Sequence, residues 1–265
     1  QDAETAAREL DLVLTSRPVA KGTRVPMAGI PHHAAENYLA RLIEKGYHVA
    51  ICEQVGDQPL KGIFPRKVVR VVTPGTLVEP GLLPGEANNY LVSVVIQDER
   101  AGVAYVDITT GEFAATELHG ADILGLLRAE LARLRPAEIL HPQGQELLNG
   151  LPGHTTSWPA WHFEAGRAEQ ELRRHFGVAS LDGFGLRGLT GAIRSSGAIL
   201  QYLADTQPAS LKLLTGLSTY HLSEFMTLDA STRRNLELTE TIRGGTIRGS
   251  LMGEVDHAVT PVGKP

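Results

Sequence analysis

The 265-residue sequence has one cysteine, no long apolar run and no phosphate-binding loop. Cys52 has no partner for an internal disulfide, and no basic-then-apolar leader is seen, so we expect an intracellular protein. The longest apolar runs, such as residues 90–96, are much shorter than a membrane span. The pattern G-x-x-x-x-G-K-S/T is absent, so we expect this chain to hold no nucleotide cofactor and to hydrolyse no ATP by itself.

The histidines and carboxylates do not form a catalytic or metal-binding pattern. His32 and His33 are adjacent, and Cys52 has no ligand nearby, so we expect no metal site and no catalytic residue. Asp98 and Asp107 remain candidates for a metal-dependent nuclease. A turn aspartate and a strand-edge aspartate are the simpler interpretation, and a ribonuclease-H-like nuclease stays an alternative.

A second alternative comes from Gly183, Gly185 and Gly188, which match G-x-G-x-x-G. Such glycines let a backbone approach a pyrophosphate at a helix start. A dinucleotide-binding domain needs a strand just before them, whereas a charged helix is predicted there. A tight turn followed by a helix is the simpler interpretation.

The charge distribution points to a local polyanion contact rather than a general one. The net charge of −5 argues against a protein that coats nucleic acid. Two stretches, residues 15–35 and 58–78, nevertheless contain no carboxylate. Their cations include Arg17, Lys21, Arg24, Arg66, Lys67 and Arg70. Both stretches could face one polyanion, although solvated loops would show the same pattern.

The first unit, residues 1–80, is predicted to be a mixed α/β domain. Helical spacing indicates helices over residues 2–10 and 35–45, the second ending at Gly46. Strands are expected over residues 12–15, 47–52 and 66–73, with a Pro/Gly-containing loop over 17–26. The Pro/Gly-rich stretch 79–86 closes the unit.

The second unit, residues 86–222, is predicted to be a ribonuclease-H-like α/β layer. Strands over residues 90–97, 103–109 and 112–117 form an antiparallel meander. A helix over 121–134, with Leu124, Leu127 and Leu131 on one face, precedes a strand over 138–141. Helices follow over 168–176 and 189–205. A third unit, residues 225–265, begins with a strand, and Asp229 caps a helix over 231–238.

Four segments resemble one family, the bacterial MutS proteins that recognise mismatched DNA. They are VPMAGIPHH (25–33), VAICEQVGD (49–57), RKVVRVVTPGT (66–76) and MTLDASTRRNLEL (226–238). The resemblance implies a mismatch-binding domain lacking its N-terminal part, a connector domain and the start of the lever and core. The family's mismatch reader, a Phe-x-Glu, is expected upstream of Gln1.

The resemblance also implies which residues approach DNA. The segment 17–27 would lie along the minor groove, with Met27 as an apolar contact near the kink. The alternative for Met27, between Pro26 and Ala28, is a core position. Arg17 and Arg24 would reach phosphates, with Lys21 between them in sequence. Arg66, Lys67 and Arg70 are further candidates, some of which form the polar face of a strand.

The partners and cofactors implied are mainly those of a longer parent protein. The parent is expected to bind duplex DNA with a mismatch or small loop and to signal through ATP and magnesium to a MutL-type protein. That partner would dock on the connector. We expect this chain by itself to have no enzymatic activity. The parent protein is expected to be a homodimer or tetramer, to use no membrane, and to lie in the bacterial cytoplasm at the nucleoid.

Overall fold

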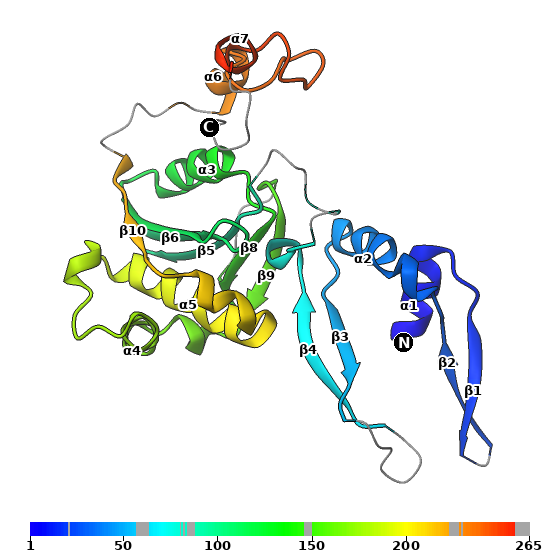
Figure 1. Cartoon of the computed structure of the whole chain (residues 1–265). Coiled ribbons are helices and arrows are strands. Elements are labelled where there is room, and N and C mark those ends of the chain that lie inside the picture. The colour runs from blue at the N-terminus through cyan, green and yellow to red at the C-terminus, as the bar shows by residue number, and fades with distance from the viewer. Residues whose placement is uncertain are drawn as a thin grey trace.

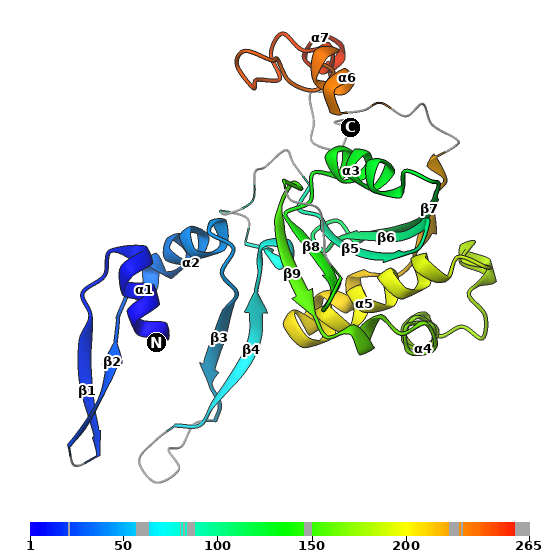
Figure 2. The same ribbon diagram turned by 180° about the vertical axis from the view of Figure 1, so that it is seen from behind.

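The computed structural model describes residues 1–20, 22–56, 64–79, 81, 83, 88–145, 150–222, 228 and 230–257. Three parts follow one another along the chain (Figure 1). Residues 1–79 form helices and two strand ribbons, residues 88–222 form a sheet with helices on both faces, and residues 230–257 form two short helices. Figure 2 shows the same arrangement from behind.

The first part is mixed α/β, as predicted. Its elements are α1 (Asp2–Leu10), β1 (Thr15–Ala20), β2 (Thr23–Met27), η1 (His32–Ala34), α2 (Ala35–Glu44), β3 (Val49–Gln54), β4 (Arg66–Val72) and η2 (Pro74–Thr76). Two predictions were wrong here. Residues 17–20 and 23–26 belong to the antiparallel ribbon β1–β2 instead of a loop, and the strand expected at 12–15 begins only at Thr15. Proline is tolerated in such a ribbon because both strands are edges.

The second part is built on a six-stranded sheet with the order β10-β7-β6-β5-β8-β9. The strands are β5 (Leu91–Gln97), β6 (Arg100–Asp107), β7 (Glu112–His119), β8 (Glu138–Pro142), β9 (His154–Trp158) and β10 (Ser218–Thr219). The meander β5-β6-β7 is antiparallel, whereas β8 and β9 continue the sheet in parallel. This arrangement confirms the predicted ribonuclease-H-like layer. The edge strands β9 and β10 were not predicted.

Helices cover both faces of the sheet because its central strands carry apolar side chains on both sides. Helices α4 (Ala165–Phe176) and α5 (Thr190–Thr206) cover one face, and α3 (Ile123–Leu134) covers the other (Figure 1). Leu127 and Leu131 of α3 are buried against the sheet, as predicted. Leu124 is exposed, which corrects its predicted inward position. The buried face instead includes Ile123 and Leu134.

Two glycines allow α5 to lie against the sheet. A Cβ atom on Gly102 of β6 would come within 2.0 Å of the Gly191 carbonyl carbon, so neither backbone leaves room for a side chain. Ser195 Oγ donates to the Gly102 carbonyl oxygen at 2.9 Å. This contact fixes the helix height above the sheet and therefore the position of Tyr202 further along α5.

The third part consists of α6 (Ala230–Asn235) and α7 (Leu251–Val255). It contacts the sheet domain through Arg135 and Glu240, whose Nη2 and Oε1 atoms lie 2.7 Å apart. The strand predicted from residue 225 and the cap Asp229 lie largely outside the described residues. The predicted helix 231–238 ends earlier because Glu237 is left-handed, with φ of 47°. No helix in the described ranges is long and apolar enough to cross a membrane.

Candidate nucleic-acid interface

Two strand ribbons extend in the same direction from the helices of the first part. Figures 1 and 2 show β1–β2 and β3–β4 running away from α1 and α2 toward one side of the molecule. The strands of these ribbons contain Arg17, Arg24, Arg66, Lys67 and Arg70, so the fold brings cations from both basic stretches to one side of the molecule. Cations gathered on one side can neutralise neighbouring phosphates of one polyanion.

Side chains alternate between the two faces of the ribbon β1–β2, and one face carries both a cation and apolar side chains. Arg17 pairs directly with Val25, and Thr15 pairs with Met27, so these four side chains point the same way. Val25 is 46% exposed and Met27 is 47% exposed. Met27 is therefore no core residue, and an apolar pair stands beside the guanidinium of Arg17.

Arg24 lies on the opposite face of the same ribbon. Its Nε atom donates to Ser16 Oγ at 2.8 Å and its Nη2 atom to the Ser16 carbonyl oxygen at 3.0 Å. These bonds hold the guanidinium across the ribbon while its side chain stays exposed. Lys21, between the two strands, lies outside the described residues.

The cations of β4 divide into two groups. Arg66 and Lys67 are exposed near the far end of the strand, and Lys67 pairs in register with Glu53 of β3. Arg70 is half-buried, and its Nη2 atom lies 2.5 Å from Oε1 of the buried Glu79. Arg70 is thus held in an ion pair with Glu79, and Arg66 and Lys67 are the more accessible of the three.

The ribbons are supported by a small core and one charged anchor. Leu39 and Ile43 of α2 pack with Val72 and Leu77. Lys45 Nζ donates to Glu9 Oε2 at 2.8 Å and to the Glu9 carbonyl oxygen at 2.9 Å, which ties α1 to the end of α2. The hydrogen bonds from Lys45 and Arg8 lower the pKa of Glu9 to about 2.

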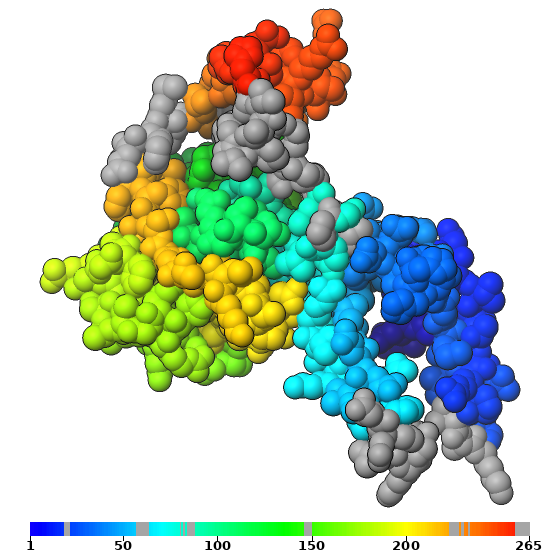
Figure 3. Space-filling view, in the orientation of Figure 1, coloured from blue at the N-terminus to red at the C-terminus, as the bar shows by residue number. Residues whose placement is uncertain are grey.

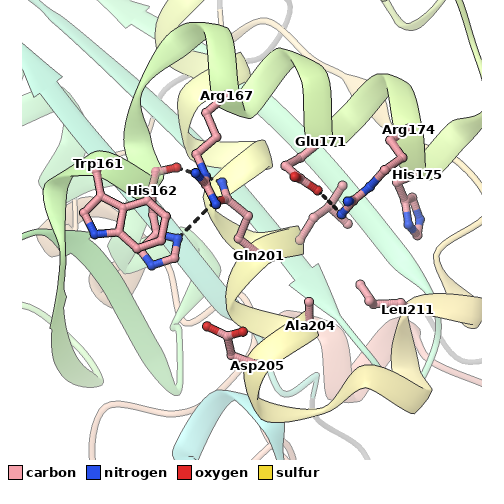
Figure 4. A pocket seen from close by; sticks show the side chains of 11 residues that line it. Trp161, His162, Arg167, Glu171, Arg174, His175, Gln201, Ala204, Asp205 and Leu211 are labelled. Carbon is pink, nitrogen blue, oxygen red and sulfur yellow. Dashed lines mark hydrogen bonds and ion pairs between the residues drawn. The ribbon is translucent and has the colours of Figure 1, made fainter.

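A separate cavity of about 350 Å³ opens between α4 and α5 (Figure 4). His162 is stacked between Trp158 and Trp161, with ring centroids 3.4 Å from each, and burial lowers its pKa. Arg167 lies over Trp161, with Cζ 4.3 Å from the ring centroid, and its Nε atom donates to Gln201 Oε1 at 2.7 Å. These contacts make a rigid aromatic and cationic surface.

The carboxylates considered for a nuclease have other roles. Asp107 is buried, and its Oδ1 atom accepts from Thr109 N at 2.8 Å and Thr109 Oγ1 at 2.6 Å, while Oδ2 accepts from Asn89 N at 3.1 Å. Asp98 sits in the exposed turn after β5 with φ of 53°. Within the described ranges, no three His, Cys, Asp or Glu side chains gather as a metal site.

The glycine pattern forms a turn that packs on the sheet edge. Gly185 and Gly188 have φ of 76° and 78°. A Cβ atom on Gly185 would meet Thr219 Oγ1 of β10 at 2.3 Å. The helix α4 precedes the pattern, with no strand between them. A dinucleotide-binding function is therefore not favoured.

One residue of the ribbon face was missed by the sequence analysis. Val25 faces the same way as Met27 and is equally exposed. The signal was available in the two-residue spacing of Val25 and Met27, but it becomes meaningful only when residues 23–27 are known to be a strand.

Comparison with known proteins agrees with this two-domain division. The family model described as MutS domain I matches residues 1–80, and that of MutS domain II matches residues 89–215. The DNA mismatch repair protein MutS of Symbiobacterium thermophilum is 48% identical over 271 residues, covering 99% of this chain and 31% of that protein. MutS of a Dehalococcoides mccartyi strain is 46% identical over 268 residues, covering 99% and 30%. The chain thus spans about a third of the length of these relatives, and it belongs to the MutS family, of which it contains domains I and II.

Proposed function

We propose that this chain supplies duplex-DNA contacts of a mismatch-recognition protein through its two ribbons. The observation that carries the proposal is the exposed face of β1–β2, where Arg17 stands beside Val25 and Met27. A guanidinium suits a phosphate, and a small apolar pair suits the wall of a minor groove near a kink. The ribbon β3–β4 adds Arg66 and Lys67 on the same side.

The shape of the molecule supports a groove contact. In the space-filling view the ribbons project beyond the body of the molecule (Figure 3). A two-stranded ribbon exposes both faces, so its side chains can meet DNA without rearrangement of a core. The cations on it would release counterions on binding, which makes the affinity dependent on salt.

Fluorescence anisotropy of a labelled duplex tests the proposal. Arg17→Ala and Arg66→Ala should each weaken binding and reduce the slope of log affinity against log salt by about one. Arg128→Ala, which removes an exposed cation of α3, is the matched control and should change neither quantity. Equal losses in all three variants would contradict an interface on the ribbons.

The specificity expected of this chain is small. The family's Phe-x-Glu reader is not among the residues 1–265, so a G·T duplex and its paired control should bind with similar, weak affinity. A mismatch preference of about tenfold, equivalent to about 1.4 kcal/mol, would refute this expectation. The longer protein is proposed to read the mismatch, to hydrolyse ATP with magnesium, to form a homodimer or tetramer, and to act at the bacterial nucleoid.

We propose further that the connector docks a MutL-type partner at the surface around Trp161. Trp161 is 46% exposed and Arg167 stacks on it. Tryptophan and arginine held rigidly at a surface are the side chains that most often dominate protein–protein affinity. Trp161→Ala should weaken partner binding in surface plasmon resonance. Leu124→Ala, which removes an exposed apolar side chain on the opposite helix layer, is the control and should not weaken it.

A further inference from the structure

The two domains meet at one buried carboxylate. Glu138 is the first residue of β8, it is 0% exposed, and its side chain lies on the α5 side of the sheet. A buried carboxylate is stable only when hydrogen-bond donors surround it. The donors to Glu138 come from both domains, so this group belongs to the interface as well as to the connector.

Domain I supplies two donors from the turn that ends β4. Thr73 Oγ1 donates to Glu138 Oε2 at 2.5 Å, and the Gly75 amide donates to the same oxygen at 2.9 Å. The turn is itself closed, because the Thr73 amide donates to Thr76 Oγ1 at 2.9 Å. A Cβ atom on Gly75 would lie 2.9 Å from Cβ of Glu138 and of Leu91, so glycine is needed for this approach.

The connector supplies the donors to the other oxygen. Thr156 Oγ1 of β9 and the Tyr202 hydroxyl of α5 each donate to Glu138 Oε1 at 2.7 Å. Burial and the neighbouring carboxylate raise the pKa of Tyr202 far above its ordinary value, which keeps its hydroxyl a donor. His48, between α2 and β3, places Nε2 3.6 Å from the same oxygen.

A second close contact lies next to this carboxylate. Gly46, which follows α2 with φ of 80°, abuts His154 of β9, and a Cβ atom there would meet His154 Nδ1 at 2.5 Å. Both strands of the ribbon β3–β4 are therefore held at their bases. The β3 end is held beside Gly46 and His48, and the β4 end is held at Thr73 and Gly75.

We propose that Glu138 is a positioning residue that locks the DNA-binding ribbon β3–β4 to the connector sheet. The seven residues of β4 span about 23 Å, so a tilt of about 10° at Thr73 would move Arg66 by about 4 Å. The carboxylate thus sets where the ribbon tip meets DNA and makes the ribbon and connector move as one body. The DNA part of this inference rests on the proposed function, whereas the lock itself does not.

The test uses the single natural cysteine of the chain. Cys52 is exposed on β3, and Arg128→Cys adds a second spin-label site on α3 of the connector. Electron–electron distance measurements then report the ribbon–connector distance without DNA. Glu138→Gln and Thr73→Val should broaden the distance distribution. In Glu138→Gln the side-chain NH2 group faces groups that donate to the carboxylate, and in Thr73→Val one donating hydroxyl is lost.

The matched control is Glu130→Gln. Glu130 is also buried and accepts from the Tyr220 hydroxyl, and its partners among the described residues all lie within the connector. This variant should leave the distance distribution unchanged. Glu138→Ala serves as the strong variant, and a thermal melt shows whether it folds. If it does not fold, Glu138→Gln and Thr73→Val decide the matter.

Hydrogen exchange gives an independent readout. The backbone amides of Thr73, Gly75 and Thr76 should exchange about tenfold faster in Glu138→Gln, the change expected for losing one charge-assisted hydrogen bond. Duplex affinity should fall about fivefold because a fixed contact surface becomes mobile. Unchanged distances and exchange in both Glu138→Gln and Thr73→Val would overturn the proposal. A parent chain that binds no DNA would refute the proposed function and leave the lock to be judged by distance and exchange alone.

Discussion

Domain I and the connector bury very different amounts of apolar surface. Among the described residues, domain I has five buried apolar side chains, four of them in one cluster, whereas the clusters on the two faces of the connector sheet have twenty and twelve. We therefore expect the connector to fold on its own, and we expect domain I to depend more on its contact with the connector at Glu138. The ribbons are left free to expose Arg17, Val25 and Met27 because they bury little of their own.

The largest expected contrast is between two apolar truncations. Phe163→Ala removes a fully buried ring from the connector core and should lower the free energy of unfolding by about 3–5 kcal/mol. Val25→Ala removes an exposed side chain and should change it by less than about 0.5 kcal/mol. Urea denaturation of both variants measures the difference. Similar losses would mean that the ribbons are as tightly packed as the sheet.

A deletion tests how independent the connector is. Residues 86–222 alone lack Thr73 and Gly75, so Glu138 loses two of its donors. Because hydrogen bonds to a charged group contribute about 1.5–3 kcal/mol each, residues 72–222 should be more stable by about 3 kcal/mol or more. Calorimetric melting compares the two fragments. An identical melting temperature would show that the carboxylate finds other donors.

A surface substitution should separate binding from stability. Met27→Ala should weaken duplex binding about threefold, because an exposed apolar contact to the groove is lost, and it should leave the melting temperature unchanged. Anisotropy and a thermal melt on the same sample provide both numbers. The exposed Leu124, changed to alanine, is the control on the connector, and a comparable loss of binding there would argue against a role for Met27.

The smallest expected effect is an acid-dependent loosening of α1. Because the pKa of Glu9 is lowered from 4.5 to about 2 in the folded chain, its stabilising contribution is complete above about pH 4.5. That contribution is lost as the pH falls toward 2 and Glu9 takes up a proton. The protection of the α1 amides, measured relative to their intrinsic exchange rate at each pH, should therefore fall below pH 4.5, and Glu9→Gln should abolish this dependence. Glu4→Gln, at an exposed ion pair of the same helix, should preserve it.

The sequence predicted the elements whose signals are local. The meander over residues 91–119 and the helices α2 and α3 follow from alternation, helical spacing and turn residues. The ribbon β1–β2 was missed because Pro18, Gly22 and Pro26 resemble loop composition. Strand β9 was missed because an edge strand with Thr155, Thr156 and Ser157 has no apolar alternation.

The site was predictable only as a list of cations. Arg17 and Arg66 of the acid-free stretches are exposed in the structure, but nothing in the pattern showed that Arg70 would pair with Glu79. The contacts of Glu138 join residues 63 and 65 positions apart, so no local pattern reveals them. Their chemistry depends on how two domains meet.

The arrangement of donors around Glu138 also bears on how the chain folds while it is being made. Synthesis proceeds from the N-terminus, and domains generally fold as they emerge. Thr73 and Gly75 are therefore outside the ribosome before Glu138 is added, whereas Thr156 and Tyr202 follow later. Two of the groups that donate to Glu138 are thus already available when the sheet forms. The carboxylate therefore has hydrogen-bond partners from the moment its strand pairs with β5.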